Sequence, residues 1–304
     1  MVGLNYFFLK FFRIEIFSPL PVSFTIEPTN ICNLKCLQCS TGIGQFNNEN
    51  GYININDFKK IVDTIFHKTI MLQLHFRGES MLHPDIFELI EHASNKKMYL
   101  SLSTNGHFIG KQAEKLINSG LDHINISLDG LTQDTYSKYR QNGDLNKVMA
   151  GIKELAAFKV KHKSSVPRIT LQMLVNRFNE NQISEFLSLQ KIKGINACLL
   201  KTMQIIDEVN ADILAPVNKK FRRSIKKSSV KICSKILTTA VITWSGKVLP
   251  CCYDKGENYI LSDSCQDLKE LSLSLKEFRI NLLQNEINPE MCENCEETVI
   301  NIYI

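Results

Sequence analysis

Short β-rich runs alternate with amphipathic helical stretches at intervals of about 25 to 30 residues, and this rhythm limits the fold more than any other feature of the sequence. Parallel strands joined by right-handed crossover helices curve toward a barrel, and six of them leave it open. We therefore predict an α/β fold, a partial (β/α)6 TIM-like barrel, over residues 21–203. The expected strands are 22–27, 70–76, 98–103, 123–128, 168–175 and 197–201, and the expected helices are 55–67, 84–94, 111–119, 132–140, 145–161 and 181–191.

Three further segments flank the predicted barrel. Residues 1–20 form an N-terminal extension, 204–232 a basic linker, and 233–304 a small cysteine-rich module. The apolar run at 6–21 is interrupted by Lys10, Arg13 and Glu15, so it falls short of the roughly 20 apolar residues that span a bilayer. We expect no membrane span and no signal peptide.

The net charge and the cysteine content limit the classes of protein to which the chain can belong. A net charge of +5 over 304 residues is mildly basic, and nucleic-acid-binding domains concentrate more charge on one face, so we expect no nucleic-acid partner. The chain has ten cysteines, which are spaced in clusters. In a chain of this length without an export signal, such clusters indicate metal or redox sites in a reducing, cytoplasmic setting.

Polar residues follow the ends of the first four predicted strands. They are the segments 32–39, 77–79, 103–106 and 129–130. The active sites of parallel barrels lie at the C-terminal ends of the strands, so these segments are expected to share one rim.

Three cysteines, Cys32, Cys36 and Cys39, follow the first strand with the spacing C-x3-C-x2-C. A 4Fe–4S cluster is filled by four thiolates, and the next cysteine, Cys198, is remote in sequence. Three local ligands would leave one iron open to an exogenous ligand, by the logic of an open catalytic metal site. A zinc site completed by a distant residue and a group of buried structural cysteines are the alternatives.

The triad resembles the signature of the radical S-adenosylmethionine (SAM) superfamily, and the resemblance extends over nearly the whole chain. It implies that the three cysteines are catalytic and hold a 4Fe–4S cluster whose open iron is chelated by the methionine part of SAM. A low-potential donor of the flavodoxin or ferredoxin type would supply the electron that cleaves SAM. The resulting 5′-deoxyadenosyl radical abstracts a hydrogen from the substrate. The residue before the third cysteine is often aromatic in the family; here it is Gln38, whose backbone is expected to meet the adenine.

Further residues resemble the family's SAM-binding positions. Gly78-Glu79 is similar to its Gly-Gly-Glu motif, with Arg77 in place of the first glycine, which implies that Glu79 accepts a hydrogen bond from the ammonium of SAM. The resemblance also assigns SAM contacts to Ser103, Asn105, Ser127 and Arg140. Taken singly, each of these is equally compatible with an ordinary turn or surface position.

The last segment carries Cys233, Cys251, Cys292 and Cys295, with the spacing C-x17-C and C-x2-C. Four soft ligands suit either zinc or a fully ligated iron–sulfur cluster. With Gly246 five residues ahead of Cys251, the pattern resembles the SPASM and twitch extensions of radical SAM enzymes, which implies an auxiliary 4Fe–4S cluster of the one-cluster, twitch-like kind. Cys252 could replace Cys251 as a ligand, whereas Cys198 and Cys265 are expected to be ordinary half-buried thiols.

The resemblance implies a radical SAM oxidoreductase or maturase that acts on a sugar or cyclitol, or on a peptide. A non-catalytic electron carrier with two clusters and a zinc-stabilised binding module are the alternatives from other classes.

Overall fold

The structure is a computed structural model, and it describes residues 20–45, 49–206, 208–222, 235–265, 267–284, 286–287 and 289–293. Nearly all of the predicted N-terminal extension lies outside these ranges, as do Cys233 and Cys295. No helix within them is long and apolar enough to cross a membrane.

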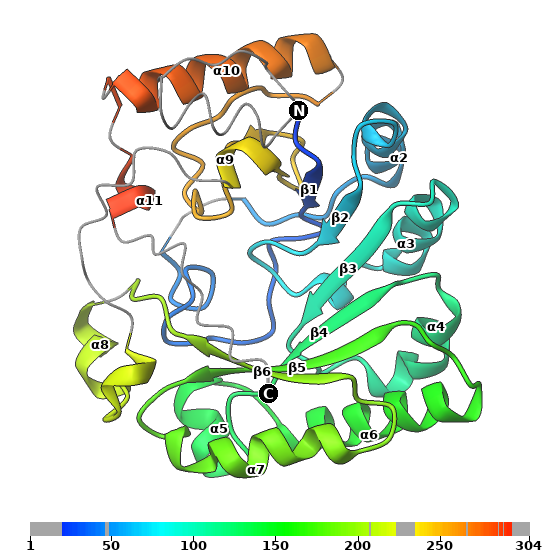
Figure 1. Cartoon of the computed structure of the whole chain (residues 1–304), viewed down its shortest axis with the longest axis vertical. Helices are drawn as coiled ribbons and strands as arrows, with labels where there is room; N and C mark the ends of the chain where they lie inside the picture. The colour runs from blue at the N-terminus through cyan, green and yellow to red at the C-terminus, as the bar shows by residue number, and fades with distance from the viewer. Residues whose placement is uncertain are drawn as a thin grey trace.

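The described strands form one eight-stranded sheet in the order β6-β5-β4-β3-β2-β1-β7-β8 (Figure 1). All neighbours are parallel except the β7–β8 pair, which is antiparallel. The sheet is not closed, which confirms the predicted partial barrel of α/β type. Its strands are β1 (Ser23–Ile26), β2 (Met71–Leu74), β3 (Tyr99–Thr104), β4 (His123–Ser127), β5 (Arg168–Val175), β6 (Ala197–Thr202), β7 (Thr239–Ile242) and β8 (Val248–Leu249).

Helices connect successive strands and cover the outside of the curved sheet (Figure 1). Side-chain caps define where several of them begin: the Asn54 carboxamide oxygen accepts from the backbone N–H groups of Asn56 and Asp57, and Asp144 accepts from that of Lys147. The connecting helices are α2 (Ile55–Ile65), α3 (Ile86–Asn95), α4 (Ala113–Asn118), α5 (Gln133–Tyr139), α6 (Leu145–Lys161) and α7 (Ile183–Ser188), with 3-10 turns η1 (Ser80–Leu82), η2 (Gly110–Gln112), η3 (Glu180–Gln182), η4 (Leu189–Lys191) and η5 (Lys219–Phe221).

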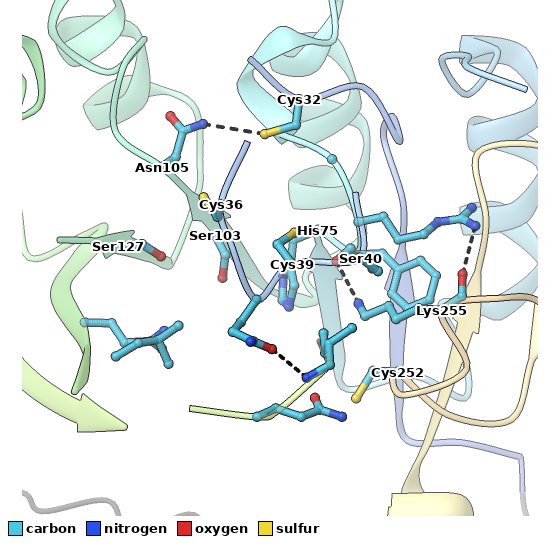
Figure 2. Close-up of a pocket in the computed structure, with 18 of the residues that line it drawn as sticks. Cys32, Cys36, Cys39, Ser40, His75, Ser103, Asn105, Ser127, Cys252 and Lys255 are labelled. Atoms are coloured by element: carbon cyan, nitrogen blue, oxygen red, sulfur yellow. Dashed lines mark hydrogen bonds between the residues drawn. The ribbon is translucent and has the colours of Figure 1, made fainter. Parts of the chain in front are cut away.

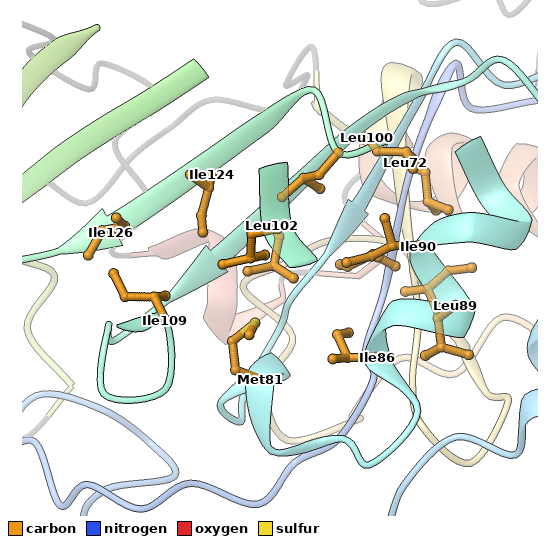
Figure 3. Close-up of a cluster of buried hydrophobic side chains, with 14 of the residues drawn as sticks. Leu72, Met81, Ile86, Leu89, Ile90, Leu100, Leu102, Ile109, Ile124 and Ile126 are labelled. Atoms are coloured by element: carbon orange, nitrogen blue, oxygen red, sulfur yellow. The ribbon is translucent and has the colours of Figure 1, made fainter. Parts of the chain in front are cut away.

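The two faces of the sheet differ sharply in polarity, because successive side chains of a strand point to opposite sides. The outer face is apolar and packs against the helices. Figure 3 shows Leu72, Leu102 and Ile124 of the strands in one buried cluster with Leu89 and Ile90 of α3, and all five are fully buried. The inner face is largely polar; its side chains that line the barrel cavity include Thr25, Gln73, His75, Ser103, Ser127, Gln172, Lys201 and Thr239.

The C-terminal segment continues the barrel sheet. Strand β7 pairs in parallel with β1, so that Ser23 lies opposite Thr239 and Ile26 opposite Ile242. A second apolar cluster joins α9 (Lys235–Thr238) to α10 (Leu268–Gln284), and α11 (Glu290–Glu293) follows. The segment expected to be a linker contains a short helix, α8 (Glu208–Leu214), at one side of the barrel (Figure 1).

Candidate active site

A cavity of about 590 Å³ lies at the C-terminal ends of the strands. The loop after β1 and the loop after β8 face each other across it (Figure 2). All the barrel residues predicted to hold the cluster or SAM line this cavity: Cys32, Cys36, Gln38, Cys39, Gly78, Glu79, Ser103, Asn105, Ser127 and Arg140. The fold therefore brings together side chains from four different strand ends.

The loop after β1 carries the three cysteines. A turn in which the Cys39 N–H donates to the Cys36 carbonyl oxygen, at 3.2 Å, sets the second and third thiols on one bend. The Cys32 sulfur accepts from the Leu34 N–H at 3.5 Å and faces the Asn105 amide nitrogen at 4.0 Å, a contact drawn in Figure 2. Donors directed at a sulfur stabilise its thiolate form, which is the form that binds metal.

The protonation of these thiols depends on what binds them. Burial raises the pKa of the Cys36 thiol to about 12, although the charge of Arg140 opposes the rise, and burial raises the pKa of Cys32 as well. Metal coordination is what would hold both groups as thiolates. No three His, Cys, Asp or Glu side chains among the described residues converge on one metal ion. A 4Fe–4S cluster does not require its thiolates to converge on one metal ion, since each of them binds a different iron.

Glu79 lies deep in the cavity wall, where its carboxylate accepts three hydrogen bonds. The Thr104 hydroxyl and the Asn105 N–H each donate at 2.6 Å, and the Met81 N–H donates at 3.1 Å. Burial nevertheless raises the pKa of Glu79, against the lowering effect of these bonds. Its Oε2 atom accepts only the Asn105 bond among the described residues, which leaves capacity for a further donor.

Gly78 sits against the backbone of the loop that leads to the cysteines. A Cβ atom at this position would lie 2.3 Å from the Thr29 carbonyl oxygen and 2.6 Å from that of Ile31. The adjacent Glu79 N–H donates to the Ile31 carbonyl at 2.8 Å. Only glycine allows this close approach, which fixes the carboxylate loop against the cysteine loop.

Arg140 joins the end of β4 to the cysteine loop. Its Nε donates to the fully buried Asp129 carboxylate at 2.5 Å, and its Nη1 lies 3.7 Å from the Cys36 sulfur. Asp129 also accepts from the Leu174 N–H at 2.7 Å. The sequence signal for the pairing of Asp129 with Arg140 was its position two residues beyond Ser127 at the end of β4.

Arg77, the departure from the family's motif, is a buried bridge. It pairs with Glu27 at the end of β1 at 2.7 Å and with Glu257 of the C-terminal segment at 2.8 Å. Its Nη1 also donates to the Lys255 carbonyl at 3.3 Å. The sequence offered no signal for this contact, because the partners are separated from Arg77 by 50 and about 180 residues.

The Gln38 side chain contacts the far wall instead of the barrel interior. Its amide oxygen accepts from the Ile206 N–H at 2.6 Å and so connects the cysteine loop to the segment after β6. The predicted contact between its backbone and adenine stays a prediction.

The C-terminal cysteines occupy different positions. Cys251 is buried outside the cavity, Cys252 lines the cavity, and the partly exposed Cys292 belongs to α11. A hydrogen bond with Cys251 and the nearby ammonium groups of Lys235 and Lys255 lower the pKa of Cys252 to about 5, against the effect of burial. The other two predicted ligands lie outside the described residues. Four soft cysteine donors suit an iron–sulfur cluster.

Comparison with known families identifies the superfamily to which the chain belongs. The sequence model of the radical SAM superfamily matches residues 26–189, more than half of the chain. The chain belongs to the radical SAM superfamily. A second model, for an iron–sulfur cluster-binding domain named SPASM, matches residues 218–296. The predicted family, SAM and 4Fe–4S clusters as cofactors, and the cysteine-rich C-terminal domain are thereby confirmed.

Curated relatives share the barrel. A probable GTP 3′,8-cyclase of Methanocaldococcus jannaschii is 34% identical over 133 residues, which cover 43% of this chain and 44% of that protein. The GTP 3′,8-cyclase of Clostridium acetobutylicum is 26% identical over 182 residues, covering 59% and 56% respectively. The chain thus matches about half the length of these radical SAM relatives.

Solved structures share the fold at low sequence identity. The structure of BtrN in complex with AdoMet and 2-DOIA has a TM-score of 0.58 at 15% identity, covering 92% of this chain and 95% of that one. The structure of anSMEcpe with bound AdoMet and a Cp18Cys peptide has a TM-score of 0.62 at 18% identity, covering 91% and 87%. Streptococcus suis SuiB bound to the precursor peptide SuiA has a TM-score of 0.61 at 18% identity, covering 82% and 63%.

Proposed function

We propose that this radical SAM enzyme oxidises a hydroxyl-bearing carbon of a sugar- or cyclitol-like substrate by two electrons. The observation that carries the proposal is the polar inner face of the barrel. Its strands present serine, threonine, glutamine and histidine side chains to the cavity. The interior of an eight-stranded TIM barrel, by comparison, is filled mainly by branched apolar side chains. A polyhydroxylated molecule can exchange hydrogen bonds with such a wall, whereas an apolar one would leave it unsatisfied.

The chain's own residues would bind and orient the cofactor. Cys32, Cys36 and Cys39 would hold the catalytic cluster, and the spare capacity of Glu79 Oε2 would accept from the ammonium of SAM. Arg140 would approach its carboxylate. The hydroxyls of Ser103 and Ser127 face the cavity and bond to no other described residue, so both can reach a bound molecule (Figure 2).

The chemistry that SAM and the catalytic cluster supply when bound is hydrogen-atom abstraction from a substrate carbon after reductive cleavage of SAM. Oxidation of an alcohol to a ketone then requires the loss of one proton from the hydroxyl and one further electron. Cys233, Cys251, Cys292 and Cys295 are proposed to hold the group that accepts this electron. A flavodoxin- or ferredoxin-type protein would supply the electron for SAM cleavage.

A peptide is the second candidate substrate. The observation that favours it is the shared fold with two structures solved with peptides, anSMEcpe and SuiB. Because the curated relatives are named GTP 3′,8-cyclases, GTP is included as a comparison compound.

Anaerobic reconstitution tests the proposal. We expect about eight irons per chain and release of 5′-deoxyadenosine from SAM after dithionite reduction. A panel of cyclitols and sugars, peptides, and GTP is then incubated with the reduced enzyme. Transfer of deuterium from a labelled carbinol carbon into 5′-deoxyadenosine, with a product lighter by two hydrogens, is the expected result. Turnover of peptides or GTP alone would overturn the substrate assignment, and zinc without iron would overturn the whole proposal.

A further inference from the structure

The backbone holds Arg140 directly opposite Cys36. The N–H groups of the residues before and after Cys36 donate to the carbonyl oxygens of the residues after and before Arg140, at 3.1 and 3.4 Å respectively. These two hydrogen bonds form a short antiparallel pairing in which Cys36 and Arg140 are partners. Residues opposite each other in such a pairing have neighbouring side chains. The chain thus places an arginine beside the middle cysteine of the triad.

The Arg140 guanidinium contacts a carboxylate and a sulfur through different nitrogen atoms. Its Nε donates to Asp129 Oδ2 at 2.5 Å, and its Nη1 donates to the Cys36 sulfur at 3.7 Å. The guanidinium is planar and its five N–H groups have fixed directions. The bond to Asp129 therefore also fixes the direction in which Nη1 points.

Asp129 is itself held firmly by the barrel. Its side chain is fully buried, and its other carboxylate oxygen accepts from the Leu174 N–H at 2.7 Å. Its backbone carbonyl accepts from the Asn179 amide at 3.0 Å. A carboxylate bonded on both oxygens has little freedom to move with the arginine. Asp129 therefore acts as a fixed anchor for the guanidinium.

Cys32 shows what a sulfur of the same triad receives from neutral donors. The Leu34 N–H lies 3.5 Å from its sulfur, and the Asn105 amide nitrogen lies 4.0 Å from it. Hydrogen bonds in which one partner is ionised are roughly twice as strong as neutral ones. Arg140 brings a full positive charge to Cys36, so its bond to a thiolate there is of the stronger kind.

We propose that Arg140 raises the reduction potential of the catalytic cluster through its hydrogen bond to Cys36, and that Asp129 is the positioning residue that aims it. This inference rests on the proposed function, which assigns the three cysteines to that cluster. Hydrogen bonds to the sulfurs and net charge both set the potential of an iron–sulfur cluster. Reduction adds one negative charge, so a positive donor on a ligand sulfur favours the reduced state.

The position of Arg140 makes this effect persist in solution and leaves room for SAM. Cys36 is buried and the Arg140 side chain is 12% exposed, so salt and water screen the interaction only weakly. The Nη2 atom bonds to no described residue, so it stays available to the SAM carboxylate. The arginine would thus help a low-potential donor to reduce the cluster before SAM is cleaved.

The test is an anaerobic redox titration of the reconstituted full-length enzyme, followed by electron paramagnetic resonance. It is run without SAM, so that a contact between Arg140 and SAM cannot contribute. The catalytic signal is the one that changes when saturating SAM is added afterwards, since only a cluster with an open iron can bind it. Iron is counted for every variant. Arg177→Met is the control for Arg140→Met, because Arg177 is exposed and donates to the Ala215 carbonyl at 3.2 Å.

Arg140→Met should lower the midpoint potential of the catalytic cluster. At a fixed donor potential the ratio of reduced to oxidised cluster should fall about tenfold, which is about 59 mV for one electron. Arg140→Lys keeps the charge but loses the planar fork, so it should show part of this shift. Arg177→Met should match wild type. An unchanged potential in Arg140→Met would overturn the proposal, and Arg140→Lys supplies the same comparison if Arg140→Met binds too little iron to titrate.

Asp129→Asn separates positioning from charge by the sign of the shift. Removal of a negative charge near the cluster would by itself raise the potential, whereas release of Arg140 from its fixed direction lowers it. We expect the potential to fall, by less than in Arg140→Met. A rise would overturn the positioning role of Asp129. Unchanged potentials with full iron content would leave the proposed oxidation standing, while a failure of sugars and cyclitols to react would leave the measured shift intact.

Discussion

The two sides of the cavity differ in how the fold holds their side chains in place. On the side predicted to bind SAM, Glu79, Asn105 and Ser127 end or follow the consecutive strands β2, β3 and β4, and backbone hydrogen bonds hold this part of the chain in place. On the far side, Lys201 and Lys255 come from the edge strand and from a loop that a buried ion pair holds in place. Strand ends tolerate little variation, whereas loops and edges can change without disturbing the sheet. On the proposed function, a fixed half that binds the cofactor would face a half that can vary with the substrate.

The largest expected effect tests whether the two halves are separable at all. Cys36→Ala should abolish SAM cleavage, because the catalytic cluster loses one of its three ligands. Cys292→Ala should retain SAM cleavage and impair only substrate turnover. Release of 5′-deoxyadenosine, measured with and without substrate, gives the answer. Loss of cleavage in both variants would show that the halves depend on each other.

The next effect concerns the bridge between the halves. Arg77→Met should lower the free energy of unfolding by about 3–5 kcal/mol, because it leaves the Glu27 carboxylate buried without its counter-charge. Lys59→Met is the matched control, since its pair with Glu88 at 2.6 Å is partly exposed and should contribute less than about 1 kcal/mol. Denaturant unfolding of both variants measures the difference. Equal losses would mean that the bridge adds no more than a surface pair.

A third prediction concerns the charge of Glu79. Burial raises the pKa of Glu79, and the positive SAM ammonium favours the ionised form, so SAM binding should release a proton. Affinity for SAM should therefore fall as the pH is lowered through the raised pKa of Glu79. Glu79→Gln should bind SAM about ten- to a hundredfold more weakly and without this pH dependence. Calorimetric titration at several pH values measures both. A variant that keeps the wild-type slope would remove Glu79 from this role.

The smallest effect comes from a partner of that carboxylate. Thr104→Val removes the 2.6 Å hydrogen bond to Glu79 and should raise the pKa of Glu79 further. SAM affinity should fall by about three- to tenfold, and its pH dependence should move to higher pH. Thr64→Val, which removes an exposed bond to the Lys60 carbonyl, is the control and should leave SAM binding unchanged. No shift in Thr104→Val would mean that the remaining two bonds suffice.

The sequence predicted the barrel well, because alternation and amphipathic spacing are local properties. The bounds of β5 and α6 match their predicted ranges, and the other predicted strands differ at their ends by one or two residues. The β7–β1 pairing could not be predicted, since a four-residue strand carries little signal and its partner lies more than 200 residues earlier.

The same division holds for the candidate site. Cysteine spacing and residues at strand ends identified positions on the SAM half, since topology alone brings strand ends together. The bridging contact of Arg77 was not identified, because it depends on Glu257, a partner that the fold brings from a distant position. Asp129 could have been found by asking which carboxylate balances Arg140.

The close contacts around Gly78 limit which residues can stand at this position. A side chain at this position would collide with the carbonyl oxygens of Thr29 and Ile31 and would push the carboxylate loop away from the cysteine loop. The spacing between the carboxylate loop and the cysteine loop is therefore set by the absence of a side chain at residue 78.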